Sequence, residues 1–348
     1  MISKSISRRD FVRLAGLGLG ASVLSACAPV RQTAAPVSSV ATAAATTEPA
    51  TPEPLPVEIV PAALQPVLRI AHISDMHIEP AGPGREKFSR AMRNIQNLSP
   101  QVDFVINAGD CVMDALYADR ERADKQWDAF QGVLNADFPL QVHHAIGNHD
   151  VWGWGLGQDE QAAIKDDPLF GKGIAMQRLG LEKSYYSFNQ GGWHFIVLDS
   201  VHPSEVEGSN HPYTGKLDEE QYNWLAKDLE FNPTSRPVCI ISHIPIFCAC
   251  ELIDGNNESS GNWIMPGAWM HIDARRLWTL FWQYPNVRLC LSGHTHQVED
   301  LRYHGVKYMT NGAISGDWWN GSFMNFPPGY VLLSLYADGS SESEYIAY

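Results

Sequence analysis

The chain has 348 residues, with 25 Lys and Arg against 39 Asp and Glu, and its formal net charge is −14. So acidic a chain disfavours nucleic-acid polymers as partners, because their binding requires a basic surface. Attraction for a phosphate group would therefore have to come from a local source, such as bound metal ions.

The first 26 residues have the pattern of an export signal. The segment SRRDFV at 7–12 resembles a twin-arginine motif, and an apolar run of thirteen residues follows at 14–26. That run is too short to span a membrane as a helix. It ends in LSAC at 24–27, which resembles a bacterial lipoprotein cleavage box with Cys27 as the lipidated first mature residue. An ordinary cleaved signal with an incidental cysteine is the alternative, and both interpretations predict export.

Residues 27–66 predict a tether and not a domain. Beyond Cys27 the segment consists mainly of Ala, Thr, Val and Pro with almost no charge, so it cannot bury a core. With an acylated Cys27 it would hold the protein at a membrane of the bacterial cell envelope, in the periplasm or at the cell surface. Removal of residues 1–26 takes away four basic residues and one acidic residue, which makes the net charge −17.

Residues 67–348 alternate between apolar, strand-like runs and helical stretches, which predicts one α/β domain. Its first part predicts strands near 67–74, 102–107 and 140–146, with helices near 85–98 and 118–135. Its middle predicts a hairpin over 185–200, a helix at 218–230, a strand at 237–242, a helix near 272–283 and a strand at 286–292. The tail predicts strands at 306–311, 313–316, 329–337 and 343–348, which would close a second sheet.

Five short blocks of metal-ligand residues occur in this domain, each directly after a strand-like run. Ligands placed beyond the ends of several strands converge on one rim of a sheet, where open α/β folds bind ligands. Each block alone is weak evidence, since a lone G-D is usually a turn. All five in this order and setting predict a two-metal site. The blocks are DMH at 75–77, GD at 109–110, GNHD at 147–150, SH at 242–243 and GHTH at 293–296.

The residue types in these blocks suit transition-metal chemistry. Imidazole, carboxylate and amide oxygen ligands bind borderline metals such as Mn, Fe, Zn or Ni, and the lack of thiolates in the blocks argues against a structural zinc site. A bridging carboxylate holds two cations about 3.5–4 Å apart, a spacing that stabilises both oxygens of an in-line phosphoryl displacement. The pKa of water bound to such cations falls from roughly 16 to about 7, so the water supplies hydroxide near neutral pH. Glycines beside the ligands allow the tight turns.

The ordered pattern D-x-H, G-D, G-N-H-D, H, G-H-x-H resembles that of the calcineurin-like metallophosphoesterase superfamily, over about Val67 to Tyr348. The resemblance implies a four-layer αββα sandwich, in which two mixed β-sheets are flanked by helices and a dimetal site lies at the rim of the sheets. It also implies two divalent transition metal ions (Mn, Fe or Zn), with Asp110 bridging them. The first metal would be bound by Asp75, His77 and His296, and the second by Asn148, His243 and His294.

The resemblance also implies a catalytic role for His149. In the superfamily the histidine at this position is not a ligand but gives a proton or hydrogen bond to the leaving oxygen. We expect the adjacent Asp150 to fix the tautomer of His149 and to raise its pKa, as a general acid near pH 7 requires. The alternative is that His149 and Asp150 only cap a turn.

Two stretches, 151–182 and 246–270, fit no regular element and carry tryptophans near the blocks. Such side chains beside a phosphate site could stack on a nucleobase or cover an acyl chain, or they could simply pack the loops against the domain. The first interpretation predicts an aromatic wall formed by Trp152 and Trp154. The further candidates are Trp263, Trp269, Trp318 and Trp319.

The remaining cysteines and strand histidines predict packing and not chemistry. Five cysteines besides Cys27 are an odd number, which disfavours a disulfide framework and predicts packed thiols. The cysteines are Cys111, Cys239, Cys248, Cys250 and Cys290. The histidines, expected in the core or supporting the site, are His72, His143, His144 and His194.

These features predict an exported, lipid-anchored, two-metal phosphoesterase. Purple acid phosphatases carry a metal-binding tyrosine where this chain has Met113, so the chain looks closer to the cyclic-nucleotide and general phosphodiesterase branches. A small organic phosphodiester is the favoured substrate, hydrolysed by a metal-bridging hydroxide with His149 as general acid. A phosphomonoester or a nucleotide-linked pyrophosphate is the next choice, because the motifs do not separate them. A non-catalytic, ligand-binding lipoprotein is the alternative from another class, which loss of a motif residue would favour.

Overall fold

The computed structural model describes residues 65–205, 210–249 and 261–348. The chain divides into two units, Met1–Val60 and Pro61–Tyr348, and the description concerns the second. The predicted export signal and nearly all of the predicted tether lie outside the described residues. Within the described ranges, none of the helices is both long and apolar enough to cross a membrane.

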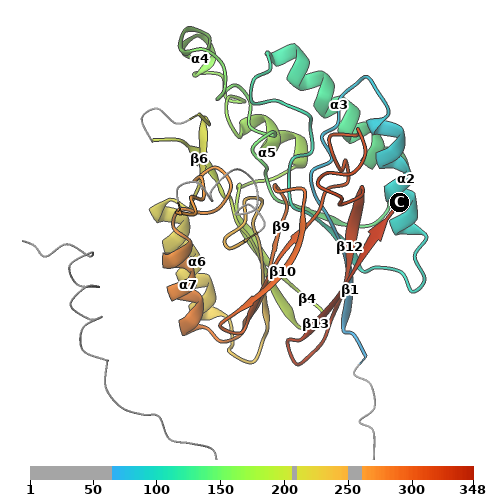
Figure 1. Cartoon of the computed structure of the whole chain (residues 1–348), viewed down its shortest axis with the longest axis vertical. Coiled ribbons are helices and arrows are strands. Elements are labelled where there is room, and N and C mark those ends of the chain that lie inside the picture. The colour runs from blue at the N-terminus through green and yellow to red at the C-terminus, as the bar shows by residue number, and fades with distance from the viewer. Residues whose placement is uncertain (1–64, 206–209, 250–260) are drawn as a thin grey trace, which may run out of the picture. The chain divides into compact units, whose positions relative to one another are not determined.

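A five-stranded sheet forms one half of the fold (Figure 1). Its strand order is β13-β12-β1-β2-β3, with β1, β2 and β3 parallel and the other two pairings antiparallel. The strands are β1 (Leu68–Ile73), β2 (Phe104–Asn107), β3 (Val142–His144), β12 (Gly329–Leu335) and β13 (Ser341–Ala347). Both faces of β1 and β2 are buried, which explains their nearly continuous apolar sequences.

A six-stranded sheet forms the other half. Its order is β10-β11-β9-β8-β5-β4, with a parallel centre and an antiparallel pairing at each edge. The strands are β4 (Tyr186–Gln190), β5 (Trp193–Val197), β8 (Val238–Ile241), β9 (Val287–Ser292), β10 (Val298–Tyr303) and β11 (Val306–Asn311). Both sheets are therefore mixed, as the family resemblance implies.

Three hydrophobic layers hold these sheets between helices, which gives the predicted four-layer αββα sandwich. Side chains such as Phe104, Phe195 and Ile241 fill the space between the sheets. The outer face of the five-stranded sheet is covered by α2 (Gly84–Gln96) and α3 (Arg120–Asp137), and that of the six-stranded sheet by α6 (Glu219–Phe231) and α7 (Ala274–Gln283). Figure 1 shows the two helix pairs on opposite sides of the sheets.

The structure corrects several element predictions. The stretch 151–182 contains two short helices, α4 (Gln158–Ile164) and α5 (Gly173–Leu179), where no regular element was predicted. Helices of this length have little sequence periodicity. A small hairpin of β6 (Val201–Pro203) and β7 (Tyr213–Gly215) and the edge strand β10 were also missed, and residues 313–316 form a turn and not a strand.

The packing of cysteines and strand histidines follows the prediction where the structure describes it. Cys111, Cys239, Cys248 and Cys290 are buried, and no disulfide joins any two of these described cysteines, while Cys250 lies outside the described ranges. His72 and His194 are buried in strands, and His143 and His144 are half-buried.

Candidate metal centre

All five ligand blocks lie beyond the carboxyl ends of parallel strands. Three follow β1, β2 and β3 of one sheet, and two follow β8 and β9 of the other. The five turns meet at one rim, so the structure brings all seven predicted ligands together. Six of these side chains are buried and the seventh, His294, is half-buried. Their individual roles as ligands remain predictions.

Five of the seven predicted ligands have a strained backbone. A left-handed φ costs a residue with a side chain on the order of 1–3 kcal/mol and tends to occur at functional sites. Here it turns consecutive side chains inward at the ends of the strands. The residues are Asp75 (φ 57°), His77 (45°), Asp110 (54°), His294 (71°) and His296 (57°).

Two glycines make this close packing possible. A Cβ atom on Gly147 would overlap the side chain and the backbone nitrogen of Asp110. A Cβ atom on Gly293 would overlap the side chains of Ser74 and Asp75. Both positions therefore require glycine because neighbouring ligand turns approach them directly.

The predicted first metal position lies between His77, His296 and Asp75. The Nε2 atoms of the two histidines are 3.0 Å apart, and Nε2 of His296 is 3.6 Å from Oδ1 of Asp75. Nδ1 of His296 donates a hydrogen bond of 2.6 Å to the carbonyl of Gly316. In the neutral ring this leaves Nε2 with its lone pair toward the other two side chains, as a metal ligand requires.

The predicted second position is built in the same way. Nε2 of His243 lies 3.0 Å from Oδ1 of Asn148, while its Nδ1 donates to the carbonyl of Ala108 over 2.9 Å. Nε2 of His294 donates to the carbonyl of Ala268 over 2.9 Å, so its Nδ1 is the nitrogen left to bind. Backbone carbonyls thus fix the tautomers of the three histidines at 243, 294 and 296.

Asp110 lies between the two positions. Its Oδ2 is 3.8 Å from Nε2 of His77 and 3.3 Å from Nε2 of His243. Its Oδ1 accepts the backbone N–H of His149 over 2.8 Å, which fixes the carboxylate plane. This placement supports the predicted bridging role, and the oxygen and imidazole donors fit two divalent transition metals.

The charges of the site favour bound cations. Burial raises the pKa of Asp75. Burial has the same tendency at Asp110, but the neighbouring His243 outweighs it and holds the pKa of that carboxyl well below its ordinary value. Burial would lower the pKa of His243, yet Asp110 and other carboxylates raise it to about 9. The site is therefore arranged to hold positive charge beside Asp110, which a divalent cation supplies more strongly than a proton.

The expected partnership of His149 and Asp150 is wrong in its geometry. Both oxygens of Asp150 accept backbone N–H groups, from Asp110, Cys111, Val112 and Gly147. Nδ1 of His149 instead pairs with the carbonyl of Met113 over 2.7 Å. Burial, and next the charge of Asp110, raise the pKa of Asp150 to about 7. Asp150 thus holds the ligand turns together, and a backbone carbonyl fixes the tautomer of His149.

A cavity of about 230 Å³ opens over the centre. No lysine or arginine of the described part of the chain lines it, so charge on a bound phosphate has to be balanced by cations. Its aromatic lining agrees with the prediction only in part, because the candidates Trp269 and Trp318 line it whereas Trp152 and Trp154 do not. Trp152 is 2% exposed, donates its Nε1 to the carbonyl of Ala118 and packs in the core with Trp154 beside it. The aromatic residues of the cavity are Tyr213, Trp269, Trp318 and Phe323.

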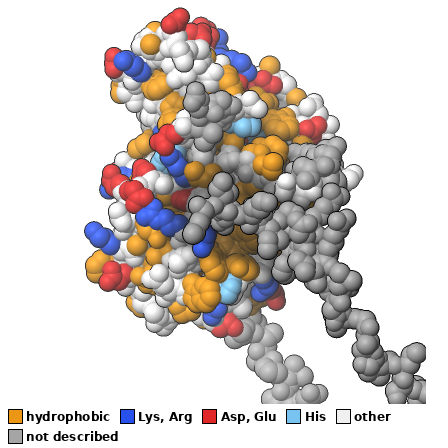
Figure 2. Space-filling model, turned by 60° about the vertical axis from the view of Figure 1, so that its left-hand side comes forward, with side chains coloured by type: hydrophobic (Ala, Val, Ile, Leu, Met, Phe, Trp, Pro, Cys, Tyr) orange, Lys and Arg blue, Asp and Glu red, His pale blue; other side chains and the backbone are white. Residues whose placement is uncertain are grey.

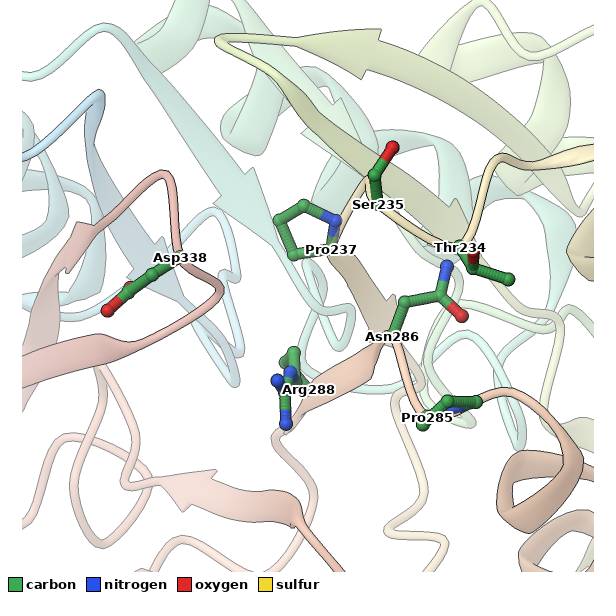
Figure 3. A pocket seen from close by; sticks show the side chains of 7 residues that line it. All are labelled: Thr234, Ser235, Pro237, Pro285, Asn286, Arg288 and Asp338. Carbon is green, nitrogen blue, oxygen red and sulfur yellow. The ribbon is translucent and has the colours of Figure 1, made fainter.

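A second cavity, of about 160 Å³, lies at the other ends of the strands (Figure 3). Pro237 and Asn286, just before β8 and β9, contribute to it together with Arg288 and Asp338. It holds none of the predicted ligands.

On the face shown in Figure 2, acidic and basic side chains are interspersed among hydrophobic ones. The rim with the seven predicted ligands is therefore the candidate active site.

The sandwich and its rim of His, Asp and Asn define a metal-dependent phosphoesterase. The chain belongs to the Calcineurin-like phosphoesterase family, which matches residues 68–298. The family uses a two-metal centre, and the buried histidines and aspartates fit it.

Two curated relatives are phosphodiesterases. A 3',5'-cyclic-nucleotide phosphodiesterase of Nostoc sp. is 24% identical over 284 residues, which are 78% of this chain and 90% of the relative. The 3',5'-cyclic adenosine monophosphate phosphodiesterase CpdA of Escherichia coli K12 is 25% identical over 244 residues, 63% of this chain and 80% of the relative. A dimetal phosphatase from Danio rerio shares the fold, with a TM-score of 0.56 and 16% identity over 82% of this chain and 100% of the phosphatase.

Several groups at the site could not be found from the sequence. The carbonyls of Ala108, Ala268 and Gly316, which orient the histidines, carry no side-chain signal. Tyr213 and Phe323 reach the cavity from a short hairpin and a turn that the sequence does not predict. Trp318 and Trp319 were both candidates, but the sequence does not reveal that Trp318 lines the cavity while Trp319 is buried.

Proposed function

We propose that the protein hydrolyses a small organic phosphodiester, and that a 3',5'-cyclic nucleotide is the substrate class that fits best. The observation that carries the proposal is the position of Asp110 between two sets of ligands, in which backbone carbonyls orient three of the four histidines. The two cyclic-nucleotide phosphodiesterases described above support the substrate class.

The ligand residues and His149 divide the work of the reaction. Two divalent cations, when bound, lower the pKa of water and offset the charge that develops on the phosphoryl group. Asp75, His77 and His296 would hold one of them and Asn148, His243 and His294 the other. His149 lines the cavity with Nδ1 tied to a carbonyl, so its Nε2 is the atom that can give a proton to the leaving oxygen. The surrounding aromatic side chains exclude water from the bound substrate.

A substrate panel on purified protein of known metal content tests this proposal. Cyclic nucleotides, a glycerol phosphodiester, a nucleoside monophosphate and a nucleotide-linked pyrophosphate are compared by kcat/KM. We expect the cyclic nucleotides to give the highest value, and chelation to abolish it. Faster release of phosphate from monoesters would favour a phosphomonoesterase. Tight binding without turnover of any substrate would favour the ligand-binding alternative.

We further propose that the protein is exported by a twin-arginine signal and anchored through lipidated Cys27. The support is the sequence at 7–12 and 24–27. Changing Arg8 and Arg9 to Lys should leave precursor in the cytoplasm. Cys27→Ser should abolish acylation and release the protein from the membrane fraction while leaving catalysis unchanged. A membrane fraction that keeps the Cys27→Ser protein would contradict the lipid anchor.

A further inference from the structure

One turn contacts all three predicted ligands of the first metal. The N–H of Ser315 donates to the carbonyl of Asp75 over 3.2 Å, and the carbonyl of Gly316 accepts from His296. The indole Nε1 of Trp319 donates to the carbonyl of His77 over 3.0 Å. The turn at 314–319 therefore positions this half of the centre through two backbone groups and one indole N–H.

The same turn places a second tryptophan over the centre. The ring of Trp318 lies 4.5 Å from that of His296 at 34°, and 5.6 Å from that of His77. Phe323 meets it edge-on at 5.8 Å. Trp318 lines the cavity and keeps 37% of its surface exposed, so a broad part of its face remains available.

The two neighbouring tryptophans have opposite surroundings. Both have left-handed backbones, with φ 44° at Trp318 and 72° at Trp319, a costly arrangement for side chains of this size. Trp319 is only 7% exposed, and its ring lies against Gly84 at the start of α2. Its backbone N–H donates to the carbonyl of Ser315. The buried ring thus fixes the turn that keeps the exposed ring at the cavity.

From this arrangement we propose that Trp318 is the platform on which the base of a base-bearing phosphodiester stacks, and that Trp319 is the positioning residue that fixes this platform to His77. The inference deepens the proposed function and rests on it. His149, the predicted acid, lies 4.7 Å from His77 ring to ring, and Trp318 lies beside the same histidine. His149 and Trp318 line the same cavity, so a substrate whose leaving oxygen meets His149 can place its base on Trp318.

Two substrates that differ only in the base test the platform. Adenosine 3',5'-cyclic phosphate is compared with cyclic ribose 3',5'-phosphate. Because base–aromatic stacking contributes roughly tenfold or more to affinity, Trp318→Ala should raise KM about tenfold for the first substrate and leave kcat and the base-free substrate little changed. Trp318→Phe keeps a flat ring and should restore much of the preference. The matched control is Trp282→Ala, a 60% exposed tryptophan on α7.

Calorimetry on metal-loaded protein gives a readout without turnover. Adenosine 5'-monophosphate should bind the wild type about tenfold more tightly than ribose 5-phosphate, and Trp318→Ala should remove that difference. If the wild type hydrolyses neither diester, the proposed function fails while this binding comparison still decides the platform. Equal losses for both ligands, or for both diesters, would overturn the platform and leave the phosphodiesterase proposal intact.

Trp319→Phe tests the positioning role. This change keeps an aromatic ring but removes the donor to His77 together with part of the buried indole. We expect roughly tenfold weaker retention of metal during dialysis against a mild chelator, as for loss of other groups that orient ligands, together with a smaller preference for the base. Metal content and base preference both equal to wild type would overturn the role of Trp319.

Discussion

Nδ1 of His149 donates a hydrogen bond of 2.7 Å to the backbone carbonyl of Met113. The carbonyl fixes the ring as the Nδ1–H tautomer when it is neutral, and it leaves Nε2 to exchange a proton within the cavity. The position of Met113 is where purple acid phosphatases carry a ligand tyrosine. In this chain the Met113 side chain is apolar, and it is the backbone carbonyl of Met113 that orients the His149 ring.

His149→Ala should separate proton donation from metal binding. His149, His77 and Asp110 lie close enough to form a possible ligand group, so a direct role at the metal has to be tested. If His149 is the acid, the variant keeps its metal content and loses roughly 10²–10⁴ in kcat. The loss should be smallest for diesters with good leaving groups. Loss of metal, or an equal loss for every leaving group, would show that His149 is a ligand or only structural.

Asp150→Asn should destabilise the fold of the rim. The carboxylate accepts four backbone N–H groups, whereas an amide presents one accepting oxygen and an NH₂ group that faces two of the donors. Leaving such buried donors unpaired costs about 3 kcal/mol or more. Denaturant unfolding and metal analysis measure the effect. The control is Asp124→Asn, whose half-exposed ion pairs contribute about 1 kcal/mol or less.

Substitution of Asp110 should affect both metals. Because its carboxylate lies beside His77 and His243, Asp110→Asn should lower the content from about two metals per chain to well below one. His296 lies only at the predicted first position, so His296→Ala should leave about one metal per chain. Elemental analysis after gel filtration distinguishes the two results. Full activity of metal-free protein would contradict the assignment of the centre.

The stability of the protein should fall in mild acid partly through His143. Burial lowers its pKa to about 4, and its ring stacks at 3.6 Å on Phe188 of the other sheet. A histidine that is held neutral in the fold stabilises it above the unfolded pKa of about 6.5, and this contribution is lost as the pH falls from 6.5 toward 4. His143→Phe should therefore reduce the acid-induced loss by about 2 kcal/mol. Parallel curves of Tm against pH for the two proteins would rule this out.

The sequence predicts most of the strands, the four large helices and the meeting of the ligand blocks. Buried parallel strands have continuous apolar runs, and a ligand that follows such a run must lie at the sheet rim. Asp75 and Asn148, more than 70 residues apart in the chain, could be placed together by this rule because both follow strands of one sheet. The helix start at Asp218 was also predictable, because its side chain caps the N–H of Gln221.

The remainder depends on tertiary packing that single residues do not reveal. Trp152 and Trp318 both follow a ligand block, yet one is buried in the core and the other lines the cavity. Asp150 was expected to serve its neighbour His149, but four N–H groups from two turns surround its carboxylate. At Asp110 and Trp318 the direction of the turn comes from a left-handed backbone at a residue other than glycine, which the sequence does not predict.

Each predicted metal position takes ligands from both sheets, since Asp75 and His77 follow β1 whereas His296 follows β9. The two Nε2 atoms that face each other at 3.0 Å belong to residues 219 positions apart. Neither position can therefore exist in a chain whose halves have not yet docked. Metal binding would therefore be among the last events of folding, and the bound ions would link the two sheets after each has formed. Unfolding that separates the two sheets would accordingly require release of the bound ions.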